Sequence, residues 1–230
     1  MGKLGAVVLV HGAWHGSWCW DGVVAELDRH RVPVKAVELP FTGFDDDVSV
    51  ARRAMEETGR ATVVVGHSYG GAVISQAASG LPNVCHLVYV GAFVPDIGDD
   101  DAALLATHGS TLFDGLVVTD DGVAVDPDAA RDLFYGDSDD ATARGLVARL
   151  RPMTLADAAG PRADPAWKSV PSTYVLCTND GVFPPEAQRV VAARVDEVVE
   201  WPTDHSPFIT RPKELAELVV SVLHRHDEVS

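Results

Sequence analysis

One stretch of the chain decides the fold class, and it reads Thr62-Val63-Val64-Val65-Gly66-His67-Ser68-Tyr69-Gly70. Its first four residues are β-branched, which is typical of a buried strand. A helix rich in small residues is predicted to follow at Gly70–Ser79. Gly66-His67-Ser68-Tyr69-Gly70 therefore forms a sharp turn between strand and helix, and its glycines suit a turn in which side chains would clash. Such a unit predicts an α/β domain with a parallel sheet.

The same alternation extends along most of the 230 residues, a length that suits one ordinary domain. Short apolar runs alternate with amphipathic stretches of helical length, as in βαβ units. The apolar runs are continuous, which indicates strands covered by helices on both faces. We expect six strands, at Ala6–Val10, Val32–Val37, Thr62–Val65, His86–Val90, Thr173–Cys177 and Glu197–Trp201. We expect helices at Trp20–Asp28, Val50–Glu57, Gly70–Ser79, Pro185–Val195 and Pro212–His224.

The alternation is interrupted once, by a segment of about 70 residues at 96–165. Within it, an Asp-Gly turn in Val117–Val125 predicts a hairpin. Two helices are expected to follow, at Asp128–Tyr135 and Asp139–Leu150. We interpret the segment as an insertion into a single domain whose core is formed by residues 1–95 and 166–230.

Charge and composition argue against several kinds of partner. The net charge of −16 disfavours nucleic acid and anionic membrane surfaces. No apolar run approaches the roughly 18 residues of a membrane span, and Leu4–Val10 is too short for a secretory signal. The isolated Cys19, Cys85 and Cys177 form neither a disulfide framework nor a metal-ligand pattern. We therefore expect a cytoplasmic protein that binds no metal; a homodimer is left open.

Ser68 is the candidate nucleophile. It stands at the apex of the strained turn, above the carboxyl ends of the strands, where open α/β sheets bind ligands. The same turn directs the backbone N–H of Tyr69, at the start of the helix, toward an anion. A serine hydroxyl needs a base that takes its proton, so a histidine is expected at the same edge.

His205 is the candidate base among nine histidines. It lies in the loop Asp204-His205-Ser206-Pro207, after the last predicted strand, and this loop emerges at the same sheet edge as Ser68. The other histidines that we considered lack such a place or point elsewhere: His30, His67, His108, His224 and His226.

Asp180 is the candidate carboxylate that orients the imidazole. It follows the predicted strand Thr173–Cys177 directly, at the carboxyl edge. Asp204 is its rival, but neighbours on one chain usually diverge in direction, so we favour Asp180 as the partner of His205.

The loop after the first predicted strand, His11-Gly12-Ala13-Trp14-His15-Gly16, is rich in glycine. Charge that develops on a carbonyl oxygen needs two N–H donors. We expect Ala13 to supply one and Tyr69 the other, with Gly12 forming the turn. Residues expected to line an apolar pocket, with ordinary core packing as the alternative for each, are Gly12, Trp14, Phe113, Phe134, Met153, Trp167 and Phe183.

These motifs resemble the α/β-hydrolase branch that contains plant methyl esterases, hydroxynitrile lyases and related bacterial esterases. The resemblance covers essentially the whole chain outside the insertion. It implies an α/β-hydrolase fold, with a six-stranded, mainly parallel sheet flanked by helices and a cap built from residues 96–165. It implies Ser68, Asp180 and His205 as catalytic triad, Ala13 and Tyr69 as oxyanion donors, and no cofactor or metal. The matching stretches are Leu9–Trp14, Gly66–Gly71, Asn179-Asp180, Phe183–Glu186 with Gln188, and Asp204–Phe208.

The resemblance further implies hydrolysis of a small carboxylic ester through an acyl-serine intermediate, with activity that rises as His205 loses its proton. Lyases of this branch carry a lysine where this chain has Ser206 and a bulkier hydroxyl residue where it has Gly12. Both differences favour an esterase. The alternatives are a hydroxynitrile lyase, a lactonase or cyclase of a biosynthetic pathway, and a receptor of the same fold with slow turnover.

Overall fold

The computed structural model describes residues 5–154 and 163–227. Its centre is a six-stranded sheet in the order β2-β1-β3-β4-β7-β8, in which all neighbouring strands run parallel. The six expected strands are confirmed, with ends that differ by up to two residues. They are β1 (Ala6–Val10), β2 (Val34–Val37), β3 (Thr62–His67), β4 (Val84–Val90), β7 (Ser172–Cys177) and β8 (Glu197–Trp201).

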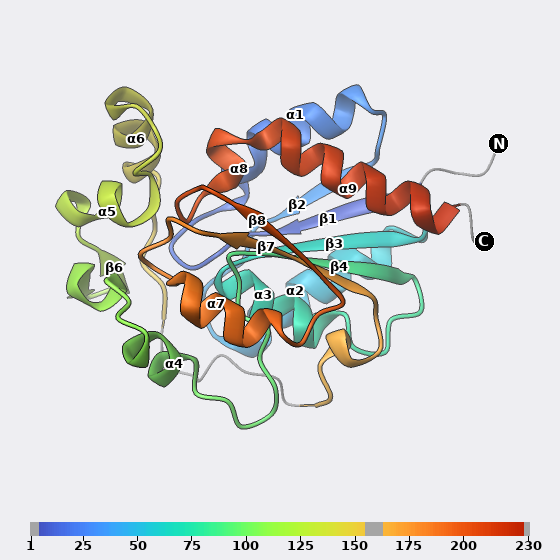
Figure 1. The fold of residues 1–230 in the computed structure, drawn as a ribbon, viewed down its shortest axis with the longest axis horizontal. Coiled ribbons are helices and arrows are strands. Elements are labelled where there is room, and N and C mark those ends of the chain that lie inside the picture. Colours follow the sequence, from blue (N-terminus) through green and yellow to red (C-terminus); the bar gives the residue numbers. More distant parts are fainter. Residues whose placement is uncertain (1–4, 155–162, 228–230) are drawn as a thin grey trace.

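Helices cover both faces of this sheet (Figure 1). α1 (Asp21–Arg29) and α9 (Pro212–Asp227) pack on one face, together with the short helices η1 (Ser17–Trp20) and α8 (Pro207–Thr210). α2 (Phe44–Glu57), α3 (Tyr69–Ala77) and α7 (Pro185–Ala192) pack on the other face, and η3 (Ala166–Lys168) lies beside α3.

The strand β1 shows why its sequence is apolar throughout. Val7 and Leu9 pack into the core under α1 and α9, whereas Val8 and Val10 pack into the core on the opposite face. All five residues of the strand are buried. Successive side chains of a strand point to opposite faces, so a strand between two helical layers needs apolar residues at every position.

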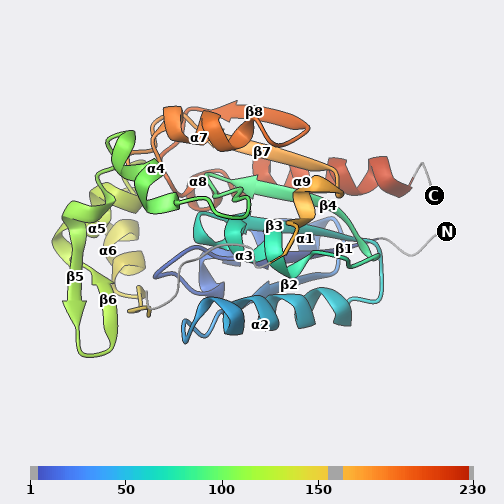
Figure 2. The same ribbon diagram turned by 90° about the horizontal axis from the view of Figure 1, so that it is seen from below.

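The inserted segment forms a separate layer beyond the carboxyl ends of the strands, coloured green and yellow in Figures 1 and 2. The expected hairpin is present, with Thr119 paired to Gly122 across its turn. The expected boundaries of a cap at 96–165 stay a prediction, and residues 155–162 lie outside the described residues. The elements of the segment are α4 (Asp101–Thr107), η2 (Leu112–Gly115), β5 (Leu116–Thr119), β6 (Gly122–Val125), α5 (Pro127–Phe134) and α6 (Asp140–Val147).

Several helices differ from the expectation: α8 was not expected, and α6, α7 and α9 each end three residues away from the expected end. The differences at α2 and α4 have a local cause. α2 begins at Phe44, six residues earlier than expected, because Asp45, Asp46 and Asp47 occupy its first turn, where carboxylates are favourable. α4 was not expected; the side chain of Asp100 caps it by accepting a hydrogen bond from the N–H of Ala103. In the parts of the chain that the structure describes, every helix is too short or too polar to cross a membrane.

Candidate active site

Ser68 lies at the turn between β3 and α3 in a strained backbone conformation. Its φ of 52° and ψ of −123° are rarely adopted by a residue with a side chain. The turn is packed so closely that its glycines cannot be replaced without movement. A Cβ on Gly66 would stand 2.7 Å from the carbonyl oxygen of Gly70, and one on Gly70 would stand 2.5 Å from that of Val10. The glycine-flanked motif is therefore required by the geometry of the turn.

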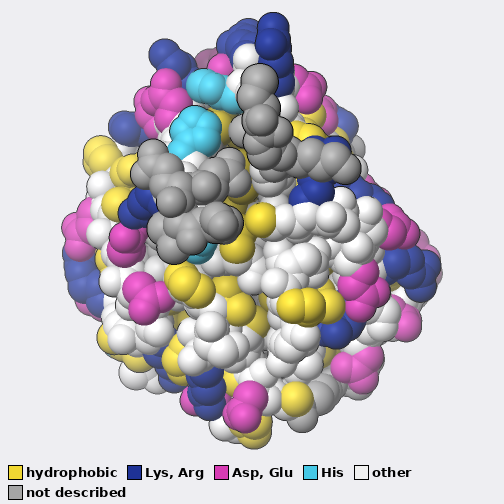
Figure 3. All heavy atoms as spheres, turned by 90° about the vertical axis from the view of Figure 1, so that its right-hand side faces the viewer, with side chains coloured by type: hydrophobic (Ala, Val, Ile, Leu, Met, Phe, Trp, Pro, Cys, Tyr) yellow, Lys and Arg dark blue, Asp and Glu magenta, His cyan; other side chains and the backbone are white. Residues whose placement is uncertain are grey.

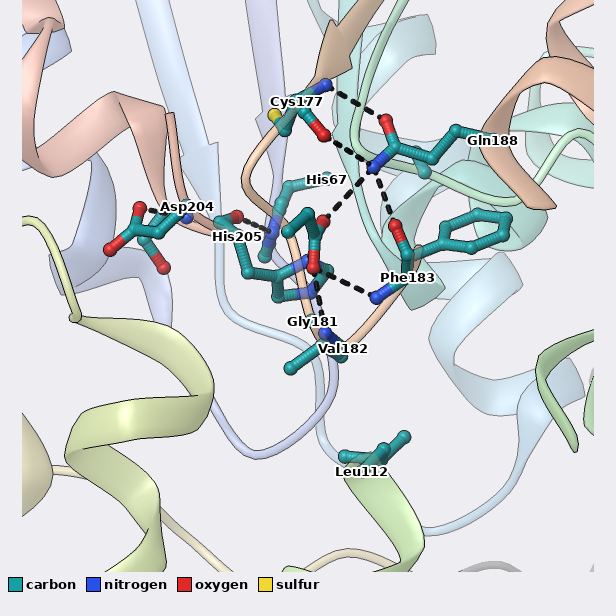
Figure 4. A network of polar contacts seen from close by, with 12 residues as sticks. His67, Leu112, Cys177, Gly181, Val182, Phe183, Gln188, Asp204 and His205 are labelled. Carbon is teal, nitrogen blue, oxygen red and sulfur yellow. Dashed lines mark hydrogen bonds and ion pairs between the residues drawn. The ribbon is translucent and has the colours of Figure 1, made fainter. Parts of the chain in front are cut away.

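Asp180 and His205 form a buried pair. His205 Nδ1 lies 2.7 Å from Asp180 Oδ2, and both side chains are almost fully inaccessible to solvent. Asp180 Oδ1 accepts hydrogen bonds from the N–H groups of Val182 and Phe183, each at 2.8 Å, and Oδ2 accepts a further one from Gln188 Nε2 at 3.2 Å (Figure 4). A carboxylate only accepts, so Nδ1 of His205 donates and Nε2 of the neutral ring keeps a lone pair that can take a proton.

Ser68 stands next to this pair at the carboxyl edge of the sheet. Its N–H donates to the carbonyl oxygen of Val90, the last residue of β4, at 3.3 Å. A Cβ on the following residue, Gly91, would stand 3.4 Å from Asp180 Oδ2 and 3.8 Å from His205 Nδ1. Gly91 has a φ of 47°, which favours glycine, and even a Cβ at this position would be in ordinary contact with the pair. The three residues that the sequence singles out therefore come together from three different strand ends.

His67 is part of this cluster, although the sequence suggested that it points elsewhere. Its Nε2 donates a hydrogen bond of 2.9 Å to the carbonyl oxygen of His205, and the two rings lie 4.6 Å apart. Burial lowers the pKa of His67 well below its usual range, with the nearby His205 as a smaller cause. His67 therefore stays neutral and holds the backbone of His205. The direction of its side chain depends on tertiary packing, and no local pattern indicates it.

The loop after β1 passes directly over Ser68. A Cβ on Gly12 would stand 2.9 Å from Ser68 Cβ and 2.7 Å from His67 Nδ1, so this position has no room for a side chain. Because Gly12 lies over Ser68, the adjacent Ala13 lies near the turn from which α3 begins at Tyr69. The hydroxyl of Tyr69 is held by Asp47, whose Oδ2 accepts its hydrogen bond at 2.7 Å. Both expected N–H donors thus lie in backbone that flanks Ser68.

Asp204, the rival of Asp180, has other partners. Its Oδ2 accepts a hydrogen bond from the N–H of Asp137 at 3.0 Å, and its Oδ1 accepts one from the N–H of Ser206 at 2.9 Å. Burial raises the pKa of Asp204, an effect that these hydrogen bonds oppose. Its carboxylate therefore faces backbone N–H groups of the inserted segment and of its own loop, while the carboxylate beside the His205 ring is that of Asp180.

An apolar cavity of about 520 Å³ adjoins the Ser68 turn. Trp14 follows Ala13 directly, and Phe93 donates its N–H to the carbonyl oxygen of Ser68 at 3.2 Å. Burial, with Asp99 as a second cause, raises the pKa of Asp101 in the cavity wall to about 7. The lining residues are Trp14, Phe93, Ala102, Leu105, Leu112, Phe113 and Leu116, with Asp99, Asp100 and Asp101.

The expected pocket residues fall into three groups. Trp14 and Phe113 line the cavity. Phe134 and Phe183 stand one layer behind: the ring of Phe134 lies 5.9 Å from that of His205, and Phe183 stacks on Phe93 at 4.7 Å.

The others lie elsewhere. Gly12 lies over Ser68, away from the cavity lining. Met153 is buried in the core, and its backbone pairs with Val123 of the hairpin. Trp167 donates its indole N–H to the carbonyl oxygen of Pro95 at 3.0 Å, outside the cavity lining. The sequence reasoning missed Phe93, although its position just after β4 is a signal of the kind that identified Asp180.

Metal ligands are not grouped in the described residues. Between residues 5 and 154 and between 163 and 227, no three His, Cys, Asp or Glu side chains come together in a way that could hold a metal ion. The groups that the structure gathers at the Ser68 turn are a hydroxyl, an imidazole, a carboxylate and backbone N–H groups.

Known proteins resemble this chain over nearly its whole length. The carbendazim hydrolyzing esterase of Nocardioides sp. (strain SG-4G) is 30% identical, over 94% of this chain and 98% of its own. Methylesterase 1 of Arabidopsis thaliana is 27% identical, over 94% of each chain.

Solved structures show the same fold. Tomato Methylketone Synthase I complexed with 2-tridecanone superposes with a TM-score of 0.83 at 22% identity, over 97% of this chain and 99% of its own. A pyrethroid hydrolase from Sphingobium faniae JZ-2 superposes with a TM-score of 0.77 at 22% identity, over 98% of this chain and 100% of its own. The sequence model of the Alpha/beta hydrolase family matches residues 7–218, which confirms the resemblance. The chain belongs to the alpha/beta hydrolase family.

Proposed function

We propose that this protein is a serine esterase that hydrolyses a small carboxylic ester through an acyl-serine intermediate. The observation that carries the proposal is the buried pair of His205 and Asp180, joined at 2.7 Å beside the strained turn that presents Ser68. Relatives described as a methylesterase and as an esterase support ester hydrolysis as the reaction.

In the first half of the reaction, Ser68 Oγ attacks the carbonyl carbon of the ester while His205 Nε2 takes the hydroxyl proton. Asp180 keeps Nδ1 protonated and stabilises the imidazolium. The N–H groups of Ala13 and Tyr69 hold the negative oxygen of the tetrahedral intermediate, and losing one such donor typically costs about 3 kcal/mol of barrier. The intermediate collapses, and the alcohol leaves with the proton from His205.

In the second half, a water molecule attacks the acyl-serine and gives its proton to His205. The second tetrahedral intermediate forms at the same N–H groups. It releases the carboxylic acid, and His205 returns the proton to Ser68. The apolar cavity beside Trp14 and Phe93 accommodates the apolar part of the ester.

The test is the hydrolysis of a short-chain p-nitrophenyl ester by the wild type and by Ser68→Ala. The matched control is Ser75→Ala, in the same helix, which removes a buried hydroxyl that bonds Gly71 and Tyr89. We expect steady turnover in the wild type and in the control, and only background in Ser68→Ala. The control should lose about 1 kcal/mol of unfolding free energy.

Two other outcomes would reject the proposal. Equal turnover by the wild type and Ser68→Ala would mean that Ser68 is not the nucleophile. A single stoichiometric burst followed by a stable adduct on Ser68 or His205, detected by mass spectrometry, would instead indicate a receptor with slow turnover.

A further inference from the structure

The inserted segment touches both loops that carry the chemistry. Three of its polar residues, Tyr135, Asp137 and Arg151, make these contacts. Tyr135 and Arg151 reach the loop after β1, which contains Ala13, and Asp137 reaches the loop that contains His205. Each contact joins residues at least 67 positions apart in the sequence. The segment is therefore fastened at both sides of Ser68.

Tyr135 acts on the first loop through His15. The Tyr135 hydroxyl lies 2.9 Å from His15 Nε2, and His15 Nδ1 lies 2.8 Å from the carbonyl oxygen of Ala13. Burial lowers the pKa of His15 to about 3, so the ring is neutral. A carbonyl oxygen only accepts, so Nδ1 carries the proton and Nε2 accepts from the tyrosine hydroxyl. A directed chain thus runs from Tyr135 to the backbone of Ala13.

Arg151 fixes the next two residues of the same loop. The backbone N–H of Arg151 donates to the carbonyl oxygen of Trp14 at 2.8 Å. Its side-chain Nη2 donates to the carbonyl oxygens of His15 at 3.1 Å and Leu39 at 3.0 Å. Glu38 pairs with the guanidinium at 2.6 Å.

Trp14 needs such support because its backbone is strained. It has a φ of 61°, which a residue with a large side chain rarely adopts. Its indole N–H donates to Val123 of the hairpin at 2.9 Å. Strain of this kind persists only where the surroundings enforce it, and here the inserted segment enforces it beside an oxyanion donor.

Asp137 secures the histidine loop by a reciprocal pair of bonds. Its Oδ2 accepts from the N–H of Asp204 at 2.8 Å, and its own N–H donates to Asp204 Oδ2 at 3.0 Å. Asp204 directly precedes His205. These two hydrogen bonds, one donated by each residue, restrain the direction in which the chain enters His205.

We propose that Tyr135, Asp137 and Arg151 are positioning residues, through which the inserted segment holds the oxyanion donor Ala13 and the base His205 in their catalytic places. The inference rests on the proposed esterase function. It gives the segment a role in transition-state stabilisation beyond that of covering a pocket. Interactions that act mainly in the transition state change kcat, whereas substrate binding and KM change little.

The first experiment compares Tyr135→Phe with Tyr89→Phe on a neutral p-nitrophenyl ester. Each variant removes one buried tyrosine hydroxyl; that of Tyr89 bonds Ser75, away from the site. We expect Tyr135→Phe to lower kcat about tenfold with KM within twofold, and Tyr89→Phe to leave both within twofold.

A second measurement separates positioning from general loosening of the structure. A trifluoromethyl ketone adds to Ser68 and forms an oxyanion, whereas the matching methyl ketone binds without that charge. We expect Tyr135→Phe and Arg151→Gln to weaken inhibition by the trifluoromethyl ketone about tenfold and to leave the methyl ketone unchanged. Arg151→Lys should recover part of the loss, because a lysine can still donate to a carbonyl oxygen.

Asp137→Ala tests the second loop, with Asp132→Ala, an exposed neighbour, as its control. We expect a kcat several times lower for Asp137→Ala alone, again with KM unchanged. The inference is overturned if Tyr135→Phe and Asp137→Ala lose no more kcat than their controls, or if inhibition by both ketones weakens equally. Absence of Ser68-dependent turnover in the wild type would instead reject the proposed function, and this inference with it.

Discussion

At the scale of single residues, the two aspartates near His205 differ in what they face. Asp180 directs one oxygen to two backbone N–H groups and the other to the imidazole. Asp204 directs both oxygens to backbone N–H groups, one of which belongs to the inserted segment. A carboxylate on the imidazole sets its tautomer, whereas one on backbone N–H groups holds loops together. We therefore expect removal of the charge at Asp180 to affect kcat far more than removal of the charge at Asp204.

Asp180→Asn should lower kcat by about 10³ to 10⁴, and it should also cost about 1 kcal/mol of unfolding free energy, because its NH₂ group would face Gln188 Nε2. Its amide oxygen can still accept from Val182 and Phe183, but its NH₂ group would face His205 and favour the wrong tautomer. Asp204→Asn should lower the unfolding free energy by about 1–3 kcal/mol, because an NH₂ group would face a backbone N–H, and reduce kcat less than tenfold. Steady-state kinetics and urea unfolding of both variants test this. Equal losses of kcat would contradict the assignment of Asp180.

The candidate site was predictable where each residue follows its own strand. Ser68, Asp180 and the loop of His205 were found because parallel strands bring their carboxyl ends to one edge. The contact of His67 with His205 was not predictable, because the direction of a side chain in a turn is set by tertiary packing and leaves no mark in the local sequence. Phe93 was missed for a different reason: an aromatic residue after a strand is equally compatible with the core.

At the scale of elements, the turn between β3 and α3 depends on how closely α3 approaches the next strand end. A Cβ on Gly71 would stand 2.2 Å from the carbonyl oxygen of Phe93 and 2.8 Å from Ala92 Cβ. Phe93 in turn donates its N–H to Ser68. The glycine therefore couples the packing of the helix to the position of the nucleophile.

Gly71→Ala should destabilise the protein by about 2–3 kcal/mol, because backbone must move to admit the methyl group, and should lower kcat as well. Gly145→Ala is the control: it is exposed in α6 with nothing within 4 Å of a Cβ, so alanine should stabilise by about 0.8 kcal/mol. Chemical denaturation with activity measured on the same samples tests the pair. A Gly71→Ala variant as stable and active as the control would show that the turn yields more easily than this geometry implies.

Strands were easier to predict than helices for a physical reason. A strand buried on both faces, such as β1, is apolar at every position and leaves a clear pattern. The first turn of α2 is acidic and resembles a loop, so its start was placed too late. α4 is short and begins in a run of aspartates, one of which caps it. Capping and helix dipole stabilise such turns without any apolar periodicity.

At the scale of the whole molecule, the hairpin was predictable, but the attachment of its segment to the site was not. The bonds of Tyr135 to His15 and of Arg151 to Trp14 join residues more than 100 positions apart. Long-range hydrogen bonds leave no local signal in a single sequence. The expectation that residues 96–165 act as a cap is a proposal about function, which the positioning experiments above test in part.

The cavity wall differs in charge from the end of the molecule that carries the termini. The net charge is −16, yet on the face seen in Figure 3, basic side chains stand among the acidic ones. The cavity wall carries Asp99, Asp100 and Asp101 but no basic residue among its lining. Asp99 is balanced by an ion pair with Arg194. Asp101, whose pKa burial raises to about 7, changes its charge within the physiological range.

This arrangement predicts how substrate charge affects turnover. Two methyl esters of nearly the same shape can be compared. Methyl 4-carbamoylbenzoate is neutral, whereas monomethyl terephthalate carries one carboxylate. We expect a lower kcat/KM for the anion, and the ratio of the two should widen about fivefold as pH rises from 6 to 8. Below about pH 7 Asp101 is protonated and neutral; above it the carboxylate repels the anion by about 1 kcal/mol.

The ratio isolates Asp101, because a pH effect on the hydrolytic steps that both esters share cancels. Asp101→Asn should therefore keep the turnover of the neutral ester and remove the pH dependence of the ratio. About 0.5 M salt should narrow the difference between the esters, since partly exposed charges are screened. A ratio that is flat between pH 6 and 8, or the same in wild type and variant, would mean that the acyl group lies away from Asp101. The apolar cavity beside Trp14 would then hold the alcohol side of the ester, and the same charge comparison made on the leaving group would decide it.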